Sequence, residues 1–197
     1  MEGCSGYLDL RCQNNQLTSL DLPNLSSLQC QNNKLNTLNI SRCTNLGTLD
    51  CSNNQLTALD VANCANLTSL TCSDNEIEQL DLSNHQNLLG VECQSNQLST
   101  LTLAGCSKLM VVKCQNNQLT NLDIDTCSEL VRLYCYENQL TELDVSHNTK
   151  LRILECYGQK NGKGWLVLKL TQSQYDEHES DNGNDWFAPE DVVDSKV

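Results

Sequence analysis

The sequence repeats itself every 21 residues, and this period restricts the chain to one kind of architecture. Residues 46–66, LGTLDCSNNQLTALDVANCAN, are followed at 67–87 by a related copy, LTSLTCSDNEIEQLDLSNHQN. The same spacing aligns a column of cysteines: Cys30, Cys51, Cys72, Cys93, Cys114, Cys135 and Cys156. A fixed period of about 20 to 50 residues indicates a solenoid, in which each unit buries its apolar edge only against its neighbours.

Two further columns keep the same period. Leucine opens the units at Leu46, Leu67, Leu88, Leu109, Leu130 and Leu151, and asparagine follows each cysteine by three residues at Asn33, Asn54, Asn75, Asn96, Asn117 and Asn138. In the stretch TLDCS, Leu49 and Cys51 alternate with polar residues, which predicts a short strand with both side chains inward. We expect each asparagine amide to bond with backbone groups of the turns in its own and the next coil, which otherwise lack partners.

The unit L-x-x-L-x-C-x-x-N-x-L-x-x-L-D-L-S-x-C-x-x resembles a leucine-rich repeat, with cysteine in place of the third strand leucine, over about residues 7–157. It is similar to the short bacterial repeats of extracellular and surface proteins and is related in style to the internalins. The resemblance implies a right-handed solenoid with a parallel β-sheet on its concave face. The segment between Asn54 and Leu67 is too short for a full helix with two connections, so short extended, β or 3-10 segments and little helix are expected on the convex side.

Composition excludes several other classes. Aromatic residues make up 4% of the chain, with a single Phe, so the core must be aliphatic and repetitive. The net charge of −13 argues against binding to nucleic acid or to an anionic membrane. No segment approaches the roughly 18 apolar residues of a membrane span, and MEGCSGYLDL does not have the pattern of a signal peptide.

Thirteen cysteines raise the question of disulfides or metal. A second column, on the convex side, holds Cys43, Cys64, His85, Cys106 and Cys127. Stacked neighbours would lie about 4.8 Å apart with parallel Cα–Cβ bonds, whereas a disulfide needs converging Cβ atoms about 3.8 Å apart. A straight column also offers too few converging ligands for zinc. Buried free thiols are therefore expected, with Cys4 as the exposed exception, and we expect no metal site and no cofactor.

An aspartate column should face solvent on the convex side, at Asp21, Asp60, Asp81, Asp123 and Asp144. Asn39 and Thr102 interrupt this run of like charges. A solvated face that resists aggregation is one interpretation, and a cation held between adjacent carboxylates is another.

Departures from the repeat predict three segments. Residues 1–24 form a short N-terminal coil, because Cys12 and Cys30 are only 18 residues apart. Residues 25–157 carry the tandem repeats. Residues 158–197 form a C-terminal cap and acidic tail, with Leu166, Leu168 and Leu170 in a closing strand and Trp186 and Phe187 holding the tail to the cap.

Function should lie on the outward residues of the strands. These are small and polar in the first half, whereas the last coils combine cationic, aromatic and acidic residues: Lys113, Arg132, Tyr134, Tyr136, Glu155 and Tyr157. Tyr and Arg tend to dominate protein interfaces, so these residues are the candidate partner-binding site. In the alternative interpretation, the tyrosines simply cover the C-terminal coils beneath the cap.

No spacing pairs a nucleophile with a base, and no glycine-rich phosphate loop occurs, so an enzyme is not expected. The prediction is a non-enzymatic module that binds an unidentified protein, as a monomer in an extracellular or cell-surface setting. Two alternatives stay open: a glycan-binding module in which Tyr134, Tyr136 and Tyr157 stack on sugar rings, and a structural spacer within a larger surface protein.

Overall fold

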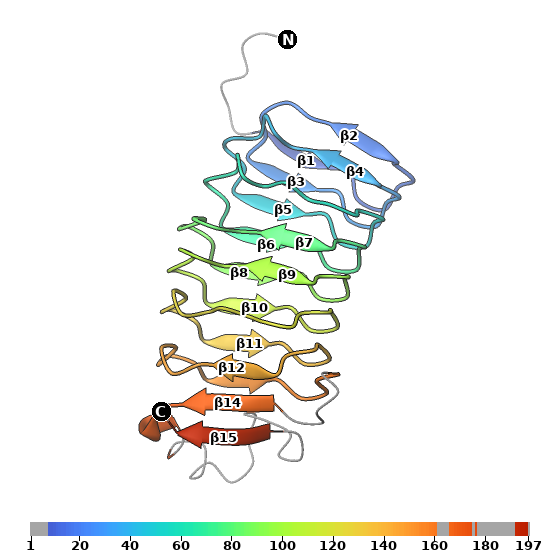
Figure 1. Ribbon diagram of the computed structural model, residues 1–197. Coiled ribbons are helices and arrows are strands. Elements are labelled where there is room, and N and C mark those ends of the chain that lie inside the picture. The colour runs from blue at the N-terminus through green and yellow to red at the C-terminus, as the bar shows by residue number, and fades with distance from the viewer. Residues whose placement is uncertain (1–7, 161–165, 175, 177–191, 197) are drawn as a thin grey trace.

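The chain winds into a parallel β-solenoid in the computed structural model, which describes residues 8–160, 166–174, 176 and 192–196. One side of the coil is a main sheet of eight parallel strands (Figure 1). In spatial order these are β1 (Asp9–Arg11), β3 (Ser27–Gln29), β5 (Thr48–Asp50), β6 (Ser69–Thr71), β8 (Gly90–Glu92), β10 (Val111–Lys113), β11 (Arg132–Tyr134) and β13 (Ile153–Glu155). This confirms the predicted repeat solenoid and its parallel sheet.

The opposite side of the solenoid carries smaller, discontinuous sheets, which are formed by some of the coils. They contain β2 (Ser19–Asp21) with β4 (Thr37–Asn39), β7 (Gln79–Asp81) with β9 (Thr100–Thr102), and β12 (Glu142–Asp144) with β14 (Leu166–Leu170) and β15 (Val192–Lys196). Within the described residues, helix is confined to 172–174 and 176. The expectation of short extended convex segments and little helix is therefore confirmed.

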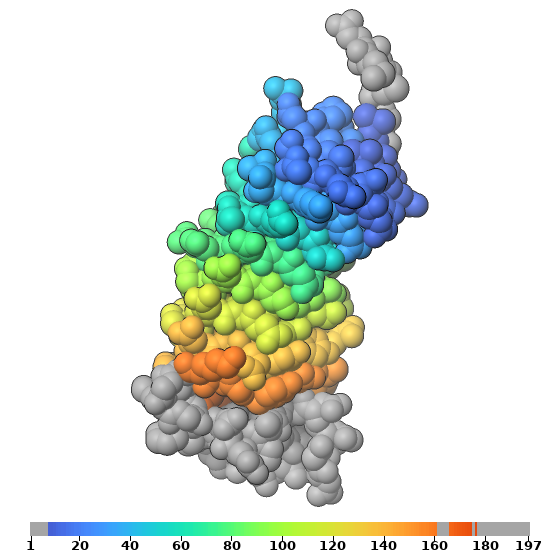
Figure 2. All heavy atoms as spheres, turned by 90° about the vertical axis from the view of Figure 1, so that its right-hand side faces the viewer, coloured from blue at the N-terminus to red at the C-terminus, as the bar shows by residue number. Residues whose placement is uncertain are grey.

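The strands of the main sheet stack in strict register. Leu49 pairs with Leu70, and Leu70 pairs with Val91, so residues 21 apart in sequence are direct neighbours in space. The hydrogen bonding continues past the strand ends, where Cys51 N donates to the carbonyl oxygen of Thr71 at 2.9 Å and Cys72 N donates to that of Glu92 at 2.8 Å. Figure 2 shows the coils as successive layers in chain order.

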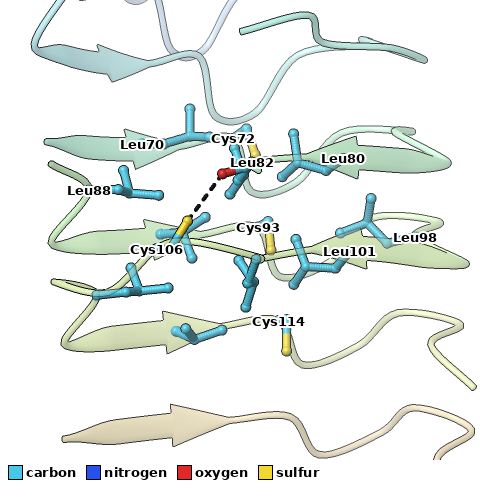
Figure 3. Packing of buried hydrophobic residues seen from close by; sticks show 14 of the residues in the cluster. Leu70, Cys72, Leu80, Leu82, Leu88, Cys93, Leu98, Leu101, Cys106 and Cys114 are labelled. Atoms are coloured by element: carbon cyan, nitrogen blue, oxygen red, sulfur yellow. Dashed lines mark hydrogen bonds between the residues drawn. The ribbon is translucent and has the colours of Figure 1, made fainter. Parts of the chain in front are cut away.

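Leucine and cysteine fill the space between the two sides (Figure 3). Leu70, Cys72 and Cys93 are fully buried, and the thiols of successive coils lie above one another. All twelve described cysteines are free thiols, and eleven of them are buried, with Cys12 in the first coil half-buried. The inward assignment of the cysteine column is confirmed. Cys4 lies outside the described residues.

Each ladder asparagine connects two coils. Asn54 Nδ2 donates to the carbonyl oxygens of Cys51 at 3.0 Å and Cys30 at 3.2 Å, while its Oδ1 accepts a bond of 3.0 Å from Leu35 N. The amide thus joins its own coil to the preceding one, whereas the sequence interpretation paired it with the next. Gln159 continues the column in the last repeat, where its amide makes the same contacts with Cys135, Cys156 and Leu140.

A left-handed backbone corner precedes every ladder amide. Positive φ angles occur at Asn14, Asn32, Asn53, Asp74, Ser95, Asn116, Glu137 and Gly158, each two residues after a cysteine of the main column. Gly and Asn adopt this conformation at least cost, because a Cβ otherwise crowds the following carbonyl. The corner turns the chain out of the main sheet and towards the convex side.

At the C-terminal end, β14 adds to the convex side by pairing with β12, and Leu166, Leu168 and Leu170 are buried. β15 pairs in parallel with β14. Trp186 and Phe187 lie outside the described residues. The boundaries of the three segments 1–24, 25–157 and 158–197 stay predictions.

Candidate interaction surface

Register stacking turns the outward side chains of the main sheet into continuous rows. The row just before the cysteines contains Arg11, Gln29, Asp50, Thr71, Glu92, Lys113, Tyr134 and Glu155. The row two residues earlier contains Asp9, Ser27, Thr48, Ser69, Gly90, Val111, Arg132 and Ile153. We refer to these two rows together with the residue after each cysteine as the main-sheet face.

The structure brings together all six residues predicted from the sequence. Lys113, Tyr134 and Glu155 are consecutive in one row, and Arg132 is two residues before Tyr134 on the same strand. Tyr136 and Tyr157 follow the cysteines of the last two coils. Arg132 is exposed, and the other five are half-buried. The six therefore form one continuous surface over the C-terminal coils.

Tyr136 and Tyr157 stack face to face, with ring centroids 4.7 Å apart and ring planes at 4°. Desolvation raises the pKa of the Tyr157 phenol, with smaller contributions from Tyr136, Glu155 and Glu137. The phenol therefore stays neutral at physiological pH and can act as a hydrogen-bond donor. This stacked pair fixes a flat aromatic area at one edge of the surface.

Two cations on this surface differ in their partners. Lys113 Nζ lies 2.8 Å from Glu92 Oε1, and both side chains are about one-third exposed, at 35% and 38%. Arg132 forms no ion pair with any residue that the structure describes. An ion pair with this much solvent exposure contributes little to stability. The main effect of the Lys113–Glu92 contact is therefore to hold the ammonium group in place.

A shallow hollow of about 250 Å³ lies beside these cations. Its lining comes from four neighbouring strands and consists of Ser69, Thr71, Gly90, Val91, Glu92, Val111, Lys113 and Arg132. Gly90 leaves the floor open, because a Cβ added there would meet no atom within 4 Å. Sequence reasoning did not predict the hollow. The signal was a glycine at a position where every other unit has a side chain.

The histidine in the convex column has a structural explanation. His85 is buried, and its ring nitrogens lie 3.1 Å from Leu82 O and 3.2 Å from Val61 O. Cys106, one coil later, directs its thiol to Leu82 O at 3.1 Å in the same way. The column continues at Asn148, whose amide donates to Ile124 O and Cys127 O at 3.0 Å each.

The convex aspartates close local turns, which the sequence interpretation did not anticipate. Asp81 Oδ1 accepts bonds from Ser83 N at 2.8 Å and Ser83 Oγ at 2.5 Å, and the hydroxyl is the main cause of the lowered pKa of Asp81. Asp144 and Ser146 repeat this arrangement. The repeated D-x-S spacing was the available signal, since Asp and Ser side chains favour such turns.

The described part of the chain has neither a metal-binding group of side chains nor a membrane-spanning helix. No group of three His, Cys, Asp or Glu side chains there could hold a metal ion. No helix in the same residues has the length and apolar character needed to cross a membrane.

A scan against models of protein families finds no match, and a search of curated proteins finds none either. Among solved structures, the functional domain of InlJ from Listeria monocytogenes, which includes a cysteine ladder, is 29% identical, with a TM-score of 0.60 over 83% of this chain and 45% of that one.

Two other bacterial structures are similar in fold. The leucine-rich-repeat protein LIC12759 of Leptospira interrogans is 23% identical, with a TM-score of 0.73 over 91% of this chain and 48% of that one. The effector YopM of Yersinia pestis is 24% identical, with a TM-score of 0.66 over 81% of this chain and 50% of that one. The chain thus spans about half the length of these three proteins.

Proposed function

Because the chain is a leucine-rich-repeat protein with an internalin-like cysteine ladder, we propose that it is a non-enzymatic module that binds a partner protein on its main-sheet face. The fold is in general one of protein-interaction modules. The observation that carries the proposal is the single continuous surface made by Lys113, Arg132, Tyr134, Glu155 and the Tyr136–Tyr157 stack.

The chemistry of this surface suits an interface. Tyr and Arg side chains are the ones that most often contribute about 2 kcal/mol or more to binding. Lys113, Arg132, Tyr134 and Glu155 lie on hydrogen-bonded strands, and the rings of Tyr136 and Tyr157 are stacked on each other, so the cost of ordering the surface on binding is small. The first half of the main-sheet face has mostly small polar residues, such as Ser27, Thr48 and Ser69, and no aromatic residue in its two rows.

Exposure on a bacterial surface or secretion is part of the proposal, supported by the internalin-like character of the repeats. Buried thiols are compatible with this setting, because a thiol without solvent access is not readily oxidised. We further propose that the chain acts as a monomer, leaving the main-sheet face free for its partner.

The test is a binding screen with the whole chain against an array of purified extracellular proteins and against a glycan array. The variant Arg132→Ala/Tyr134→Ala should lose the protein hits, while the matched control Thr48→Ala/Gln29→Ala, on the same rows of the first half and outside the hollow, should keep them. Thermal unfolding must show that both variants remain folded. Protein hits that survive Arg132→Ala/Tyr134→Ala would place the interface elsewhere.

Hits confined to the glycan array would favour the glycan-binding alternative. In the stack, each of Tyr136 and Tyr157 has one ring face covered by the other, so a single sugar could approach only an outer face. No hit of either kind would favour the spacer alternative.

A further inference from the structure

Gly90 is the position on the main-sheet face that the fold explains least. It lies within strand β8, where glycine weakens a strand because it has no side chain to pack and more conformational freedom to lose. Its backbone does not have the positive φ that would call for glycine, and a Cβ there would meet no atom within 4 Å. The neighbours in its row are Ser69 and Val111. The fold would accept a side chain here, and glycine within a strand often marks a place where a ligand approaches the backbone closely.

The charged side chains that line the hollow have a net positive charge. Lys113 and Arg132 line the hollow together with one carboxylate, that of Glu92. Glu92 already contacts Lys113, whereas Arg132 has no ion pair among the described residues. One positive charge is therefore left over at the hollow, in a chain whose net charge is −13. The nearest acidic group further along the row, Glu155, is separated from Lys113 by Tyr134.

We propose that this hollow receives an acidic side chain, Asp or Glu, from the protein partner, with its carboxylate on Arg132. This inference rests on the proposed function and names the chemistry of the partner. The planar guanidinium of Arg132 can donate two parallel bonds to one carboxylate, and Lys113 adds a second donor. Glu92 keeps Lys113 at the rim, and Gly90 provides the space for the stem of the incoming side chain.

The size of the hollow agrees with one side chain rather than with a whole peptide segment. Its volume is about 250 Å³, and Ser69, Thr71 and Gly90 contribute polar or backbone surface while Val111 contributes apolar surface. An acidic side chain matches both parts, because its methylene groups can lie on Val111 while its carboxylate reaches the cations. Tyr134, next to Lys113 in its row, would cover the residues that flank the acidic one.

The experiment uses the whole chain to select binders from a random peptide display library, followed by affinity measurement of the enriched peptides. The variants are Gly90→Val, which fills the hollow with the residue found one coil later, and Arg132→Gln, which removes the charge. Thr48→Val is the matched control, since Thr48 lies in the same row outside the hollow. Thermal unfolding checks that each variant keeps the stability of the parent.

Support requires that enriched peptides share an acidic position and that its change to the amide weakens binding at least tenfold. Gly90→Val and Arg132→Gln should each weaken binding as much, while Thr48→Val should not. The peptide change and Arg132→Gln together should cost no more than either alone, because both remove the same contact.

Three other outcomes overturn the inference and can be told apart. In the first, the enriched peptides depend on Tyr134 but have no acidic preference and still bind the Gly90→Val variant. This result would support the proposed function and contradict the inference that the partner inserts an acidic side chain. In the second, the chain binds sialylated or uronic-acid glycans and no peptides, and Arg132→Gln weakens this binding. Arg132 would then bind the carboxylate of a sugar, which contradicts both proposals. Absence of any binding to the main-sheet face would defeat both as well.

Discussion

Each ladder asparagine bonds to backbone groups through both its amide nitrogen and its amide oxygen. Asn117 Nδ2 donates to Cys114 O at 3.0 Å and Cys93 O at 3.1 Å, and its Oδ1 accepts a bond of 2.9 Å from Leu98 N. The amide therefore satisfies three backbone groups, two of them in the preceding coil. No other side chain of this size offers donors and an acceptor in one planar group.

The change Asn117→Asp should destabilise the protein by about 3 kcal/mol near pH 7. A carboxylate cannot donate, so the carbonyls of Cys93 and Cys114 would face a buried negative charge instead of an N–H group. Urea unfolding of the variant measures the loss. Asn15→Asp is the control, because Asn15 is exposed in the first coil and should tolerate the change. Equal losses for the two variants would contradict the role assigned to the buried amide.

Cysteine in the main column acts as a small buried apolar residue. Cys93 is fully buried, and desolvation holds the pKa of its thiol well above the usual value. Replacing it by serine should cost about 1 to 3 kcal/mol, since a hydroxyl would be buried with few partners. The midpoint of denaturant unfolding measures this cost. Cys12→Ser, at the half-buried end of the column, should cost less, and an unchanged midpoint for Cys93→Ser would show that a hydroxyl is accommodated there.

At the scale of the element, the left-handed corner is the part of the coil that tolerates the fewest residue types. Ser95 and Glu137 adopt φ angles of 55° and 54° at positions where Asn, Asp or Gly stands in the other coils. For residues other than Gly, Asn and Asp this conformation costs roughly 1 to 2 kcal/mol. These two corners therefore carry backbone strain that the neighbouring coils avoid.

Ser95→Asn should stabilise the protein by about 0.5 to 1 kcal/mol, because it restores a residue type that accepts the left-handed conformation. The free energy of unfolding in urea, compared with the parent, gives the gain. Asn116→Ser makes the converse change one coil later and should lose a similar amount. A gain for the second variant would remove corner strain as the explanation.

Most of the coil could be predicted from the sequence because its period equals one turn of the solenoid. Residues such as Cys51 and Cys72, 21 apart, had to be neighbours once the period was recognised, and alternation in TLDCS settled which side chains point inward. The direction of the amide contacts and the strained corner at Ser95 could not be predicted, because both depend on backbone angles within the turn.

The residues of the candidate surface could be predicted from the sequence, but the contacts between their side chains could not. The period alone places Lys113, Tyr134 and Glu155 in one row. The contact between Lys113 and Glu92 and the stack of Tyr136 on Tyr157 depend on the side-chain conformations of neighbouring coils. The hollow depends on what Gly90 lacks, which a search for chemically active residues passes over.

At the scale of the whole molecule, the two cysteine columns make folding sensitive to alkaline pH. Burial raises the pKa of Cys30, Cys114 and Cys127 to about 12 and that of Cys64 to about 11. In the unfolded chain these thiols ionise near pH 8.5. Above that pH the unfolded state binds fewer protons than the folded state, so the free energy of unfolding falls as pH rises towards the folded pKa.

Stability should therefore be constant between about pH 7 and 8 and then decline, by up to about 1.4 kcal/mol per pH unit for each thiol that ionises on unfolding. Urea unfolding under reducing conditions at pH 7.5, 8.5 and 9.5 measures the slope. Cys114→Ala should reduce the pH dependence of the free energy of unfolding by the contribution of one thiol, although the variant is less stable at every pH. A slope that does not change from parent to variant would mean that other groups cause the decline.

The hydrogen bonds between coils, such as those from Cys51 N to Thr71 O and from Asn54 to Cys30 O, join one layer to the next along the long axis of the stack. A tensile force applied to the two ends acts along these bonds and loads the outermost coil first, so the stack would peel layer by layer instead of shearing as a block. Each released coil of 21 residues would add about 70 Å of extended chain. The molecule would then behave as an extensible tether that lengthens under force in equal steps, one for each coil released.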